Sequence, residues 1–528
     1  MRQPTQAKTN RGQVSRTASI PAPTGGWNTR DNVADMDAKD AVTMDNWFPI
    51  PSEVMLRKGS SNHVTGFTGP VESLLPYQSA TASKLFACVD VGATAEIVDV
   101  TASDVDGTPP ASAVTGLNNA RFQHVNMSTT GGAFLLAVNG SDKMRIYNGT
   151  IWGYESDGTF TAVTGGDTTK WIHLNLHMRR VWAIQKDSLL AWYLPADSIG
   201  GAAASFDFRP IFKMGGYLMS MGTWTLDAGQ GVDDHAVFVT SEGEVAVYKG
   251  SDPTSITTWS LVGVWYVGSP IGRRCLQKFG GDLLMLCKEG LLPFSKALMS
   301  SRVNAKSTLT DKIQPTISES TSIYSSFFGW EILPYPQENM LIINVPVVYN
   351  LPSPSITHQY AMNTISGAWS RFIGWNAHCW AEFNGAIYFG TDTSVVHAWT
   401  GTADLGANIE SEVQQAFSYF GSRALKNWRM ARPILRADIQ PGLLLGFGVD
   451  YNMTDPVGSP TYASSTASLW DSGIWDSAIW GGDLTIFKDW QGIFGLGYCG
   501  SLHIKTASKS SNCTWASTDY LLEDGGVI

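Results

Sequence analysis

The sequence predicts an all-β protein: a β-propeller of about six or seven blades, with an extended N-terminal arm before it and a C-terminal β module after it. Composition is the first observation, since charged residues are only 16% of the 528 while Gly (53) and Trp (20) are numerous. An average soluble domain has about 25% charged residues, so this profile favours strands and tight turns over helices rich in Glu and Lys. The second observation is a hairpin pattern that recurs at a nearly constant interval along the chain.

Each repeat of this pattern has a short apolar run, a polar turn, and a second strand that ends near an aromatic residue. A propeller blade cannot bury both of its faces alone, and radial packing hides each face against a neighbour. The alternative is a pair of stacked sandwiches whose hairpins share this spacing by accident. The hairpins begin at Lys84, Ala133, Val181, Ala236, Asp282, Met340 and Ala386.

The N-terminal arm is expected over residues 1–24, and the propeller over residues 70–405. The arm is polar, contains proline, and has four basic residues and no acid. Such a composition is typical of a flexible segment. It either touches nucleic acid or becomes ordered when it packs on a neighbouring subunit.

Residues 25–69 are expected to form a helix and turn segment that packs on the propeller. Val33, Met36 and Met44 lie near helical spacing, and prolines that follow within the segment would end the helix. The acids of this stretch do not match a calcium loop, which requires Gly at its sixth position and Glu at its twelfth.

Residues 406–528 are expected to form a C-terminal β module with Trp-rich turns. Its first part, from Ile409 to Phe420, fits helical spacing and strand alternation equally well, so periodicity leaves both open. A helix would align the basic residues that follow into a stripe facing a channel lumen or an acidic partner, while the alternative is a solvated or salt-bridged surface. These residues are Arg423, Lys426, Arg429 and Arg432.

The stretch "SLWDSGIWDSAIWGG" repeats Trp at a spacing of five, at Trp470, Trp475 and Trp480. A spacing of five residues does not keep the tryptophans on one face of a helix or on one face of a strand. We therefore expect turns at Asp-Ser and Gly-Gly, with a Trp anchored between them. These three residues, with Trp27 and Trp47, are candidates for a subunit interface. An aromatic platform for sugars or bases is the alternative.

The net charge of −10, from 36 basic and 46 acidic residues, argues against tight binding of nucleic acid by the whole chain. The six cysteines are too sparse for a disulfide framework and are expected to be buried apolar residues in a reducing compartment. The N-terminal stretch lacks the apolar core of a signal peptide, and no stretch approaches the length of a membrane span.

No catalytic, cofactor or metal motif stands out. The stretch "GLGYCG" at residues 495–500 matches the dinucleotide-binding pattern, but the residues after it are strand-like where that pattern requires a helix. The nine histidines show no ligand spacing. We therefore expect a protein that is not an enzyme and carries neither cofactor nor metal.

Three stretches together carry a resemblance: "GGWNTRDNVADMDAKDAVTMDNWFPIPSEVMLRKG" (25–59), "SGAWSRFIGWNAHCWAEFNGAIYFG" (366–390), and the tail from residue 490. They resemble tail nozzle proteins, virion structural proteins of short-tailed phages. The resemblance implies a propeller-bearing subunit of a ring, a hexamer, that continues the portal and adaptor channel of the virion tail. It also implies tail fibres or a needle as partners, double-stranded DNA passing without specific binding, and assembly in the host cytoplasm.

An alternative function of another class stays open. A propeller with exposed tryptophans could bind or cleave glycans of a host surface, because aromatic rings stack on sugars. Paired carboxylates for such cleavage are invisible without a fold. The two functions differ in oligomeric state, since a nozzle is a ring and a glycan protein is a monomer or trimer.

Overall fold

The computed structural model describes residues 15–225, 234–255, 257–297, 308–346, 357–458, 485–509 and 511–524. The chain divides into two compact units. One, here called the propeller, comprises residues 59–364 and 372–401; the other, here called the terminal module, comprises residues 1–58, 365–371 and 402–528. No helix in the described ranges has the length and apolar character needed to cross a bilayer.

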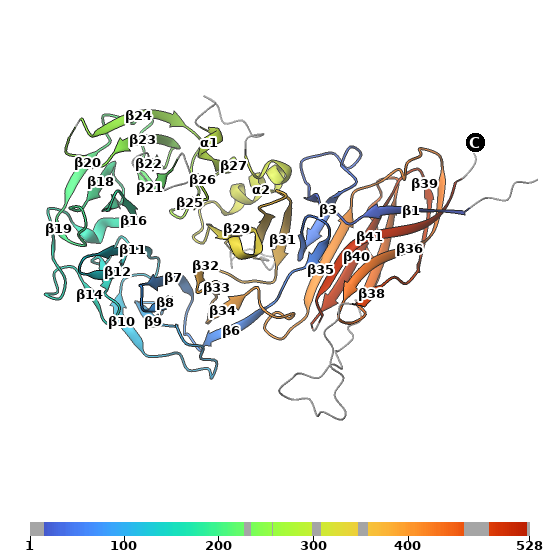
Figure 1. Cartoon of the computed structure of the whole chain (residues 1–528), viewed down its shortest axis with the longest axis horizontal. Coiled ribbons are helices and arrows are strands. Elements are labelled where there is room, and N and C mark those ends of the chain that lie inside the picture. Colours follow the sequence, from blue (N-terminus) through green and yellow to red (C-terminus); the bar gives the residue numbers. More distant parts are fainter. Residues whose placement is uncertain are drawn as a thin grey trace, which may run out of the picture. The chain divides into compact units, whose positions relative to one another are not determined.

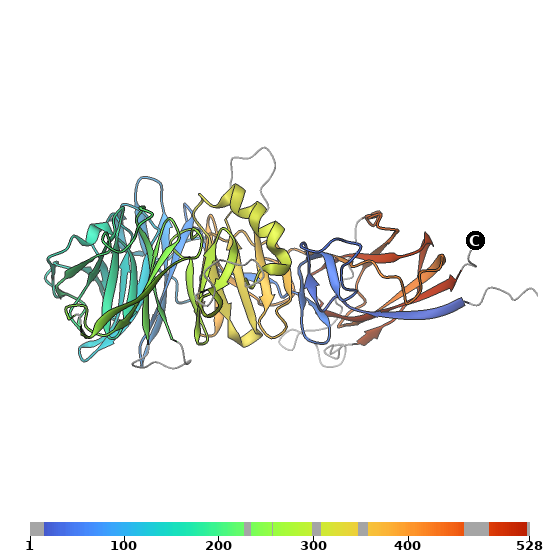
Figure 2. The same cartoon turned by 90° about the horizontal axis from the view of Figure 1, so that it is seen from above.

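The propeller is a ring of small antiparallel sheets arranged about an axis (Figure 1), and it is seen edge-on in Figure 2. Four consecutive sheets have four strands each. Their strands are β7 (Val71–Gln78), β8 (Ser83–Asp90), β9 (Ala95–Asp99) and β10 (Ser112–Leu117); β11 (Gln123–Thr129), β12 (Gly132–Val138), β13 (Arg145–Tyr147) and β14 (Trp152–Tyr154); β16 (Trp171–His177), β17 (Arg180–Gln185), β18 (Leu190–Tyr193) and β20 (Ala204–Asp207); and β21 (Leu218–Trp224), β22 (His235–Thr240), β23 (Glu244–Gly250) and β24 (Trp259–Tyr266).

Two further sheets continue the ring, and a last sheet closes it. The described strands of the fifth sheet are β25 (Leu276–Phe279), β26 (Asp282–Cys287) and β27 (Gly290–Pro293). Helices α1 (Phe294–Ala297) and α2 (Gln314–Tyr324) follow it in the sequence. The described strands of the sixth sheet are β28 (Glu331–Tyr335), β29 (Met340–Val345) and β30 (His358–Asn363), and β31 (Trp369–Ile373) comes next. The closing sheet contains β32 (Cys379–Phe383), β33 (Ala386–Gly390), β34 (Ser394–Ala398) and β6 (Ser60–Thr65). Short connecting elements are β15 (Val163–Thr164), β19 (Gly201–Ala202), η1 (Thr168–Lys170), η3 (Asp311–Ile313) and η4 (Pro336–Glu338).

The ring closes because a strand from the start of the propeller completes its last sheet. β6 pairs antiparallel with β34, from Ser60 opposite Ala398 to Thr65 opposite Ser394. The inner strands β7, β11, β16, β21, β25, β28 and β32 contact one another in that order, and β32 contacts β7. The prediction of an all-β propeller of about six or seven blades is confirmed.

The hydrophobic core lies between neighbouring blades rather than at a single centre. The cluster between the third and fourth sheets contains Trp182, Phe238, Tyr248 and Trp259. In it the rings of Trp182 and Trp259 stack with centroids 5.4 Å apart. Similar clusters join the first sheet to the closing sheet and to the second. Each blade thus buries its faces on its neighbours, which is why a single blade has no stable fold alone.

The terminal module is built from strands far apart in the sequence. Its strands are β1 (Ser15–Pro21), β2 (Gly26–Trp27), β3 (Asp40–Asp45), β4 (Trp47–Pro49), β5 (Val54–Leu56), β35 (Ile409–Gln415), β36 (Lys426–Ala437), β37 (Leu443–Val449), β38 (Thr485–Phe487), β39 (Gln491–Gly497), β40 (Gly500–Ser508) and β41 (Cys513–Asp524). One sheet pairs β36 with β41 and β41 with β1, so the described part of the expected arm is an ordered strand within the same chain. The other pairs β3 with β35, β35 with β40, and β40 with β37.

The helix expected within residues 25–69 does not form. Residues 40–45 form β3, which pairs with β35, and β4 and β5 form a hairpin. The segment up to residue 58 belongs to the terminal module, and only residues 59–69 belong to the propeller. A short isolated helix is marginal in water. Here β35, which follows the propeller in the sequence, supplies backbone hydrogen bonds to β3 instead.

The region that periodicity left open between helix and strand is a strand at its start. Residues 409–415 form β35, with Ile409 and Val413 buried. The six cysteines are buried and unpaired, as expected.

Candidate functional site

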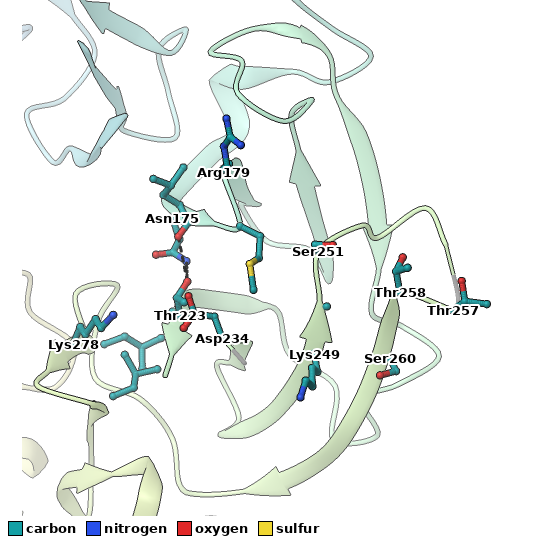
Figure 3. A pocket seen from close by; sticks show the side chains of 16 residues that line it. Asn175, Arg179, Thr223, Asp234, Lys249, Ser251, Thr257, Thr258, Ser260 and Lys278 are labelled. Atoms are coloured by element: carbon teal, nitrogen blue, oxygen red, sulfur yellow. Dashed lines mark hydrogen bonds between the residues drawn. The ribbon is translucent and has the colours of Figure 1, made fainter. Parts of the chain in front are cut away.

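The propeller has a cavity of about 1050 Å³ beside its third, fourth and fifth sheets (Figure 3). Its wall combines apolar side chains such as Leu276 and Leu283 with hydroxyl and amide groups, and it includes three cations, Arg179, Lys249 and Lys278. The Asn175 amide nitrogen donates to the Thr223 hydroxyl at 3.0 Å, which joins β16 to β21. A wall that mixes apolar groups with a few polar ones is typical of a ligand-binding cavity.

Asp234 is the one carboxylate among the described residues of this wall. The Thr225 hydroxyl donates to it at 2.7 Å, and the Lys278 ammonium donates to Thr225 at 3.3 Å. Burial lowers the pKa of the adjacent His177 to about 4, so its imidazole is neutral at pH 7. Glycoside hydrolysis generally requires two carboxyl groups flanking the bond, and the described wall supplies one.

Arg274, whose side chain is only 10% exposed, links several sheets of the propeller. Its guanidinium donates to Glu331 at 3.2 Å and to the Ser73 hydroxyl at 2.8 Å. Burial raises the pKa of Glu331, while the neighbouring Arg274 acts to lower it. Arg274 thus joins Ser73 of the first sheet to Glu331 of the sixth.

The predicted basic residues do not form a stripe. In the strand β36, Lys426 points inward, whereas Arg429 and Arg432 both lie on the more exposed face. A bulge between Trp428 and Met430 shifts the alternation of side chains there. Lys426 is buried and donates to backbone carbonyls, and burial lowers its pKa. Arg429 pairs with Glu523 at 3.2 Å and Arg432 with Asp519 at 2.6 Å. Arg423 lies over the ring of Tyr419, 5.0 Å from its centroid.

These contacts favour the salt-bridged alternative for the two arginines of β36. Each guanidinium is already paired with a carboxylate of β41. A phosphate or an acidic partner would have to displace that carboxylate, so these residues are weak candidates for a lumen contact.

Two of the predicted interface tryptophans lie in the interior of the terminal module. Trp47 has no exposed surface and its ring centroid lies 6.3 Å from that of Trp515. Trp27 is 6% exposed, and its indole donates to the Val42 carbonyl. They are core residues, so an interface cannot use their side chains directly. Trp470, Trp475 and Trp480 lie outside the described residues.

Exposed apolar side chains lie instead on edge strands. β24 is the outermost strand of the fourth sheet, at the rim of the propeller (Figure 1), and here the β24 edge means its exposed residues. They are Leu261, Val262, Val264 and Tyr266, each 38% to 53% exposed. An edge strand of this kind has free backbone groups as well as apolar surface, and natural proteins usually cover or charge it.

The terminal module has a second such surface on β39. Phe494, Leu496 and Tyr498 alternate outward and are 82%, 65% and 53% exposed; they are here called the β39 face. The glycines between them point inward, where a Cβ at Gly497 would lie 2.2 Å from Val449. The "GLGYCG" pattern therefore serves strand packing, and β40 follows it where a dinucleotide fold needs a helix.

Sequence reasoning missed both Arg274 and the β39 face. Nothing in the sequence reveals the partners of Arg274, because Ser73 and Glu331 come from other sheets. The β39 face did have a signal, since large apolar residues alternate with glycine over residues 492–498.

Glu412, Asp455 and His503 bring ligand atoms together within the terminal module. His503 lies 2.8 Å from Glu412, and this contact most strongly lowers the pKa of Glu412. The Lys505 ammonium lies 3.4 Å from Glu412 and 3.8 Å from Asp455. The Lys505 ammonium therefore pairs with the same two carboxylates that a metal would use.

The fold and these surfaces define the chain as a β-propeller protein with an added β module. No family model and no curated protein matches its sequence. Similar solved structures include BBS1N in complex with ARL6DN (11% identity, TM-score 0.37, 66% of this chain and 99% of that one) and Sqt1 of Saccharomyces cerevisiae (11%, 0.35, 64% and 99%). The Swd1 propeller domain of Myceliophteria thermophila is another (10%, 0.35, 65% and 96%).

In one further BBS1N structure the match covers 63% of that chain and 42% of this one, at a TM-score of 0.28. Identities and TM-scores of this size carry nothing about what this chain binds. The function is therefore argued from the chain's own surfaces.

Proposed function

We propose that the chain is a structural subunit of a short-tailed phage tail nozzle, a ring of about six copies below the portal and adaptor. Its partners are then the adaptor ring above, tail fibres or a needle, and the DNA that passes during ejection. The protein is assembled in the host cytoplasm and works in the virion. The sequence resemblance motivates this proposal, and the surfaces of the two units support it.

The observation that carries the proposal is the pair of exposed apolar edges. The β24 edge lies on the propeller and the β39 face on the terminal module, so one chain has two different adhesive surfaces. Contacts between unlike surfaces run head to tail, and they close into a ring when the rotation allows it. Large permanent interfaces are more apolar than the rest of a protein surface.

The charge of the chain supports a role as a conduit. A net charge of −10 suits a lumen through which DNA passes, because each phosphate neutralised by Lys or Arg would hold the DNA back.

The test is the oligomeric state of wild type and of one surface variant. Mass photometry and negative-stain images of the purified chain, alone and with adaptor, should show rings of about six copies. F494S/L496S should remain a single chain, because it removes apolar contact area from the β39 face without touching the core.

The matched control is V105S, which removes an exposed apolar side chain, 58% exposed, from the propeller surface outside both edges. It should assemble like wild type. A wild-type chain that stays single even with adaptor, and that binds or releases cell-surface sugar, would overturn the nozzle and favour the glycan alternative. Assembly of F494S/L496S into normal rings would overturn the role of the β39 face.

A further inference from the structure

Arg273 lines a cavity of the propeller, and its guanidinium has no partner among the described residues. No carboxylate of those residues lies within ion-pair distance of it, and none of their oxygens accepts a hydrogen bond from it. The next residue, Arg274, is paired with Glu331, and Arg121 nearby holds Glu72 with both its Nε and its Nη2, at 2.9–3.1 Å. Arg273 therefore differs from its two basic neighbours in having its donors available.

Burial makes this charge costly. Arg273 is partly buried, and desolvation lowers the pKa of its guanidinium. The carboxylate of Asp187, which lies beyond ion-pair distance, acts to raise this pKa but does not offset the desolvation. His173, which lies close enough to feel the charge, has its pKa lowered to about 4 by burial and is neutral at pH 7. An anion placed against Arg273 would recover the interaction that the fold leaves unmade.

The cavity around Arg273 is about 610 Å³ and is lined by groups from several blades. Asn119, Gln123 and Ser141 supply amide and hydroxyl groups, and the exposed Lys186 ammonium also has no carboxylate in ion-pair distance among the described residues. The cavity is therefore lined by the guanidinium of Arg273, the ammonium of Lys186 and several neutral hydrogen-bond donors. This combination of groups is typical of an anion-binding site.

An aromatic ring also lines the cavity. The ring of Phe328 lies 4.6 Å from the guanidinium of Arg121 and 4.9 Å from that of Arg274. These two arginines are paired with Glu72 and Glu331, respectively. Side chains that already have such partners need less ordering on binding.

The charge of the lining identifies the ligand chemistry. The lining cations Arg121, Lys186 and Arg273 exceed the acids Glu72 and Asp90 by one charge, 3 − 2 = 1. A carboxylate carries one negative charge, whereas a phosphate monoester carries about 1.5 to 2 at pH 7. The planar fork of an arginine also matches a carboxylate in two parallel hydrogen bonds.

We propose that this cavity binds a carboxylate, with Arg273 as the residue that pairs with it and Lys186 and the amides around it as further donors. The carboxylate comes either from a small free acid or from the acidic side chain of a peptide. The site is independent of the surfaces used above for ring assembly.

The experiment titrates the purified chain with succinate, a hexaglutamate peptide and inorganic phosphate by isothermal calorimetry at low salt. Wild type should bind at least one carboxylate probe with saturation. R273Q should weaken that binding about tenfold or more, since a charge-assisted pair is lost. The control R209Q, which changes an exposed arginine paired with Asp207, should stay within about twofold of wild type.

The two sources give different patterns. Binding of hexaglutamate alone assigns the site to an acidic peptide, and binding of succinate as well assigns it to a small acid. R273Q should melt at the same temperature as wild type or higher, because it removes a desolvated charge. No saturable binding of either carboxylate, tighter binding of phosphate than of both, or unchanged binding by R273Q would each overturn the proposal.

Discussion

The propeller and the terminal module are both built from antiparallel strands, but they assemble them in opposite ways. From β7 to β30 the propeller uses strands in chain order, each sheet formed by the next stretch of sequence. The terminal module joins three stretches of chain, and its β1, near the N-terminus, pairs with β41, near the C-terminus. One region is therefore almost local in sequence, and the other depends on the two ends of the chain meeting.

This difference explains which region the sequence could predict. All seven predicted hairpins begin at, or directly beside, the first residue of the second strand of a propeller sheet, as at Lys84 in β8 and Ala386 in β33. A second strand has neighbours on both edges and blades on both faces, so it is apolar throughout. Strands of the terminal module such as β1 and β36 have one more exposed face, and β1 pairs with β41 at the other end of the sequence.

A buried arginine holds distant segments together in each region. In the terminal module the Arg57 side chain is fully buried and pairs with Asp404, 347 residues away. In the propeller Arg274 joins Glu331 to Ser73. A buried arginine paired with a carboxylate thus joins sheets of the ring in one unit and segments far apart in the sequence in the other.

The largest effect expected is from tryptophan removal, which tests whether the two regions fold independently. W182A in the propeller and W428A in the terminal module should each cost about 3–5 kcal/mol, because both side chains are at most 1% exposed. Differential scanning calorimetry should show two transitions, of which W182A lowers one and W428A the other. Equal shifts of a single transition by both variants would mean that the units unfold as one.

A second prediction concerns the buried pair of the terminal module. D404A removes the carboxylate that faces Arg57 and should cost about 3 kcal/mol in urea unfolding, because the charge stays in a low-dielectric site. D207A, which breaks the exposed Arg209 pair, should cost less than about 1 kcal/mol. The double variant R57M/D404L should recover much of the loss; failure to recover would mean that Asp404 acts through other contacts.

The smallest effect expected for a single residue is that of each buried histidine on the acid sensitivity of the propeller. Burial lowers the pKa of His124, His173 and His177 to about 4 from an ordinary value of 6.5. The unfolded chain takes up these protons first, so stability is complete above pH 6.5 and falls as pH drops towards 4, by about 1–3 kcal/mol per histidine.

Urea unfolding between pH 7 and pH 4.5 measures this loss. In H177Q the free energy of unfolding of the propeller should fall less steeply as the pH is lowered. Carboxylates that titrate in the same range contribute equally to wild type and variant, so their contribution drops out of the difference. A slope that H177Q leaves unchanged would show that His177 is not held neutral by the fold.

Part of the site could be predicted from the sequence, and part could not. The pairing of Arg429 and Arg432 follows from β36 lying beside β41, which no periodicity reveals. Trp47 was an interface candidate because a large aromatic residue suits an interface and a core equally. Its zero exposure is decided by packing against Trp515, a residue from the opposite end of the chain.

By itself the sequence determined the repeating propeller, the buried cysteines and the low, acidic charge, because these depend on local pattern and composition. The tertiary structure alone decided that residues 40–45 are a strand, that Arg274 pairs with Glu331, and that Arg273 has no partner among the described residues. The physical reason is that strand pairing, burial and ion pairing are set by neighbours in space, and in this chain those neighbours come from as far apart as its two ends.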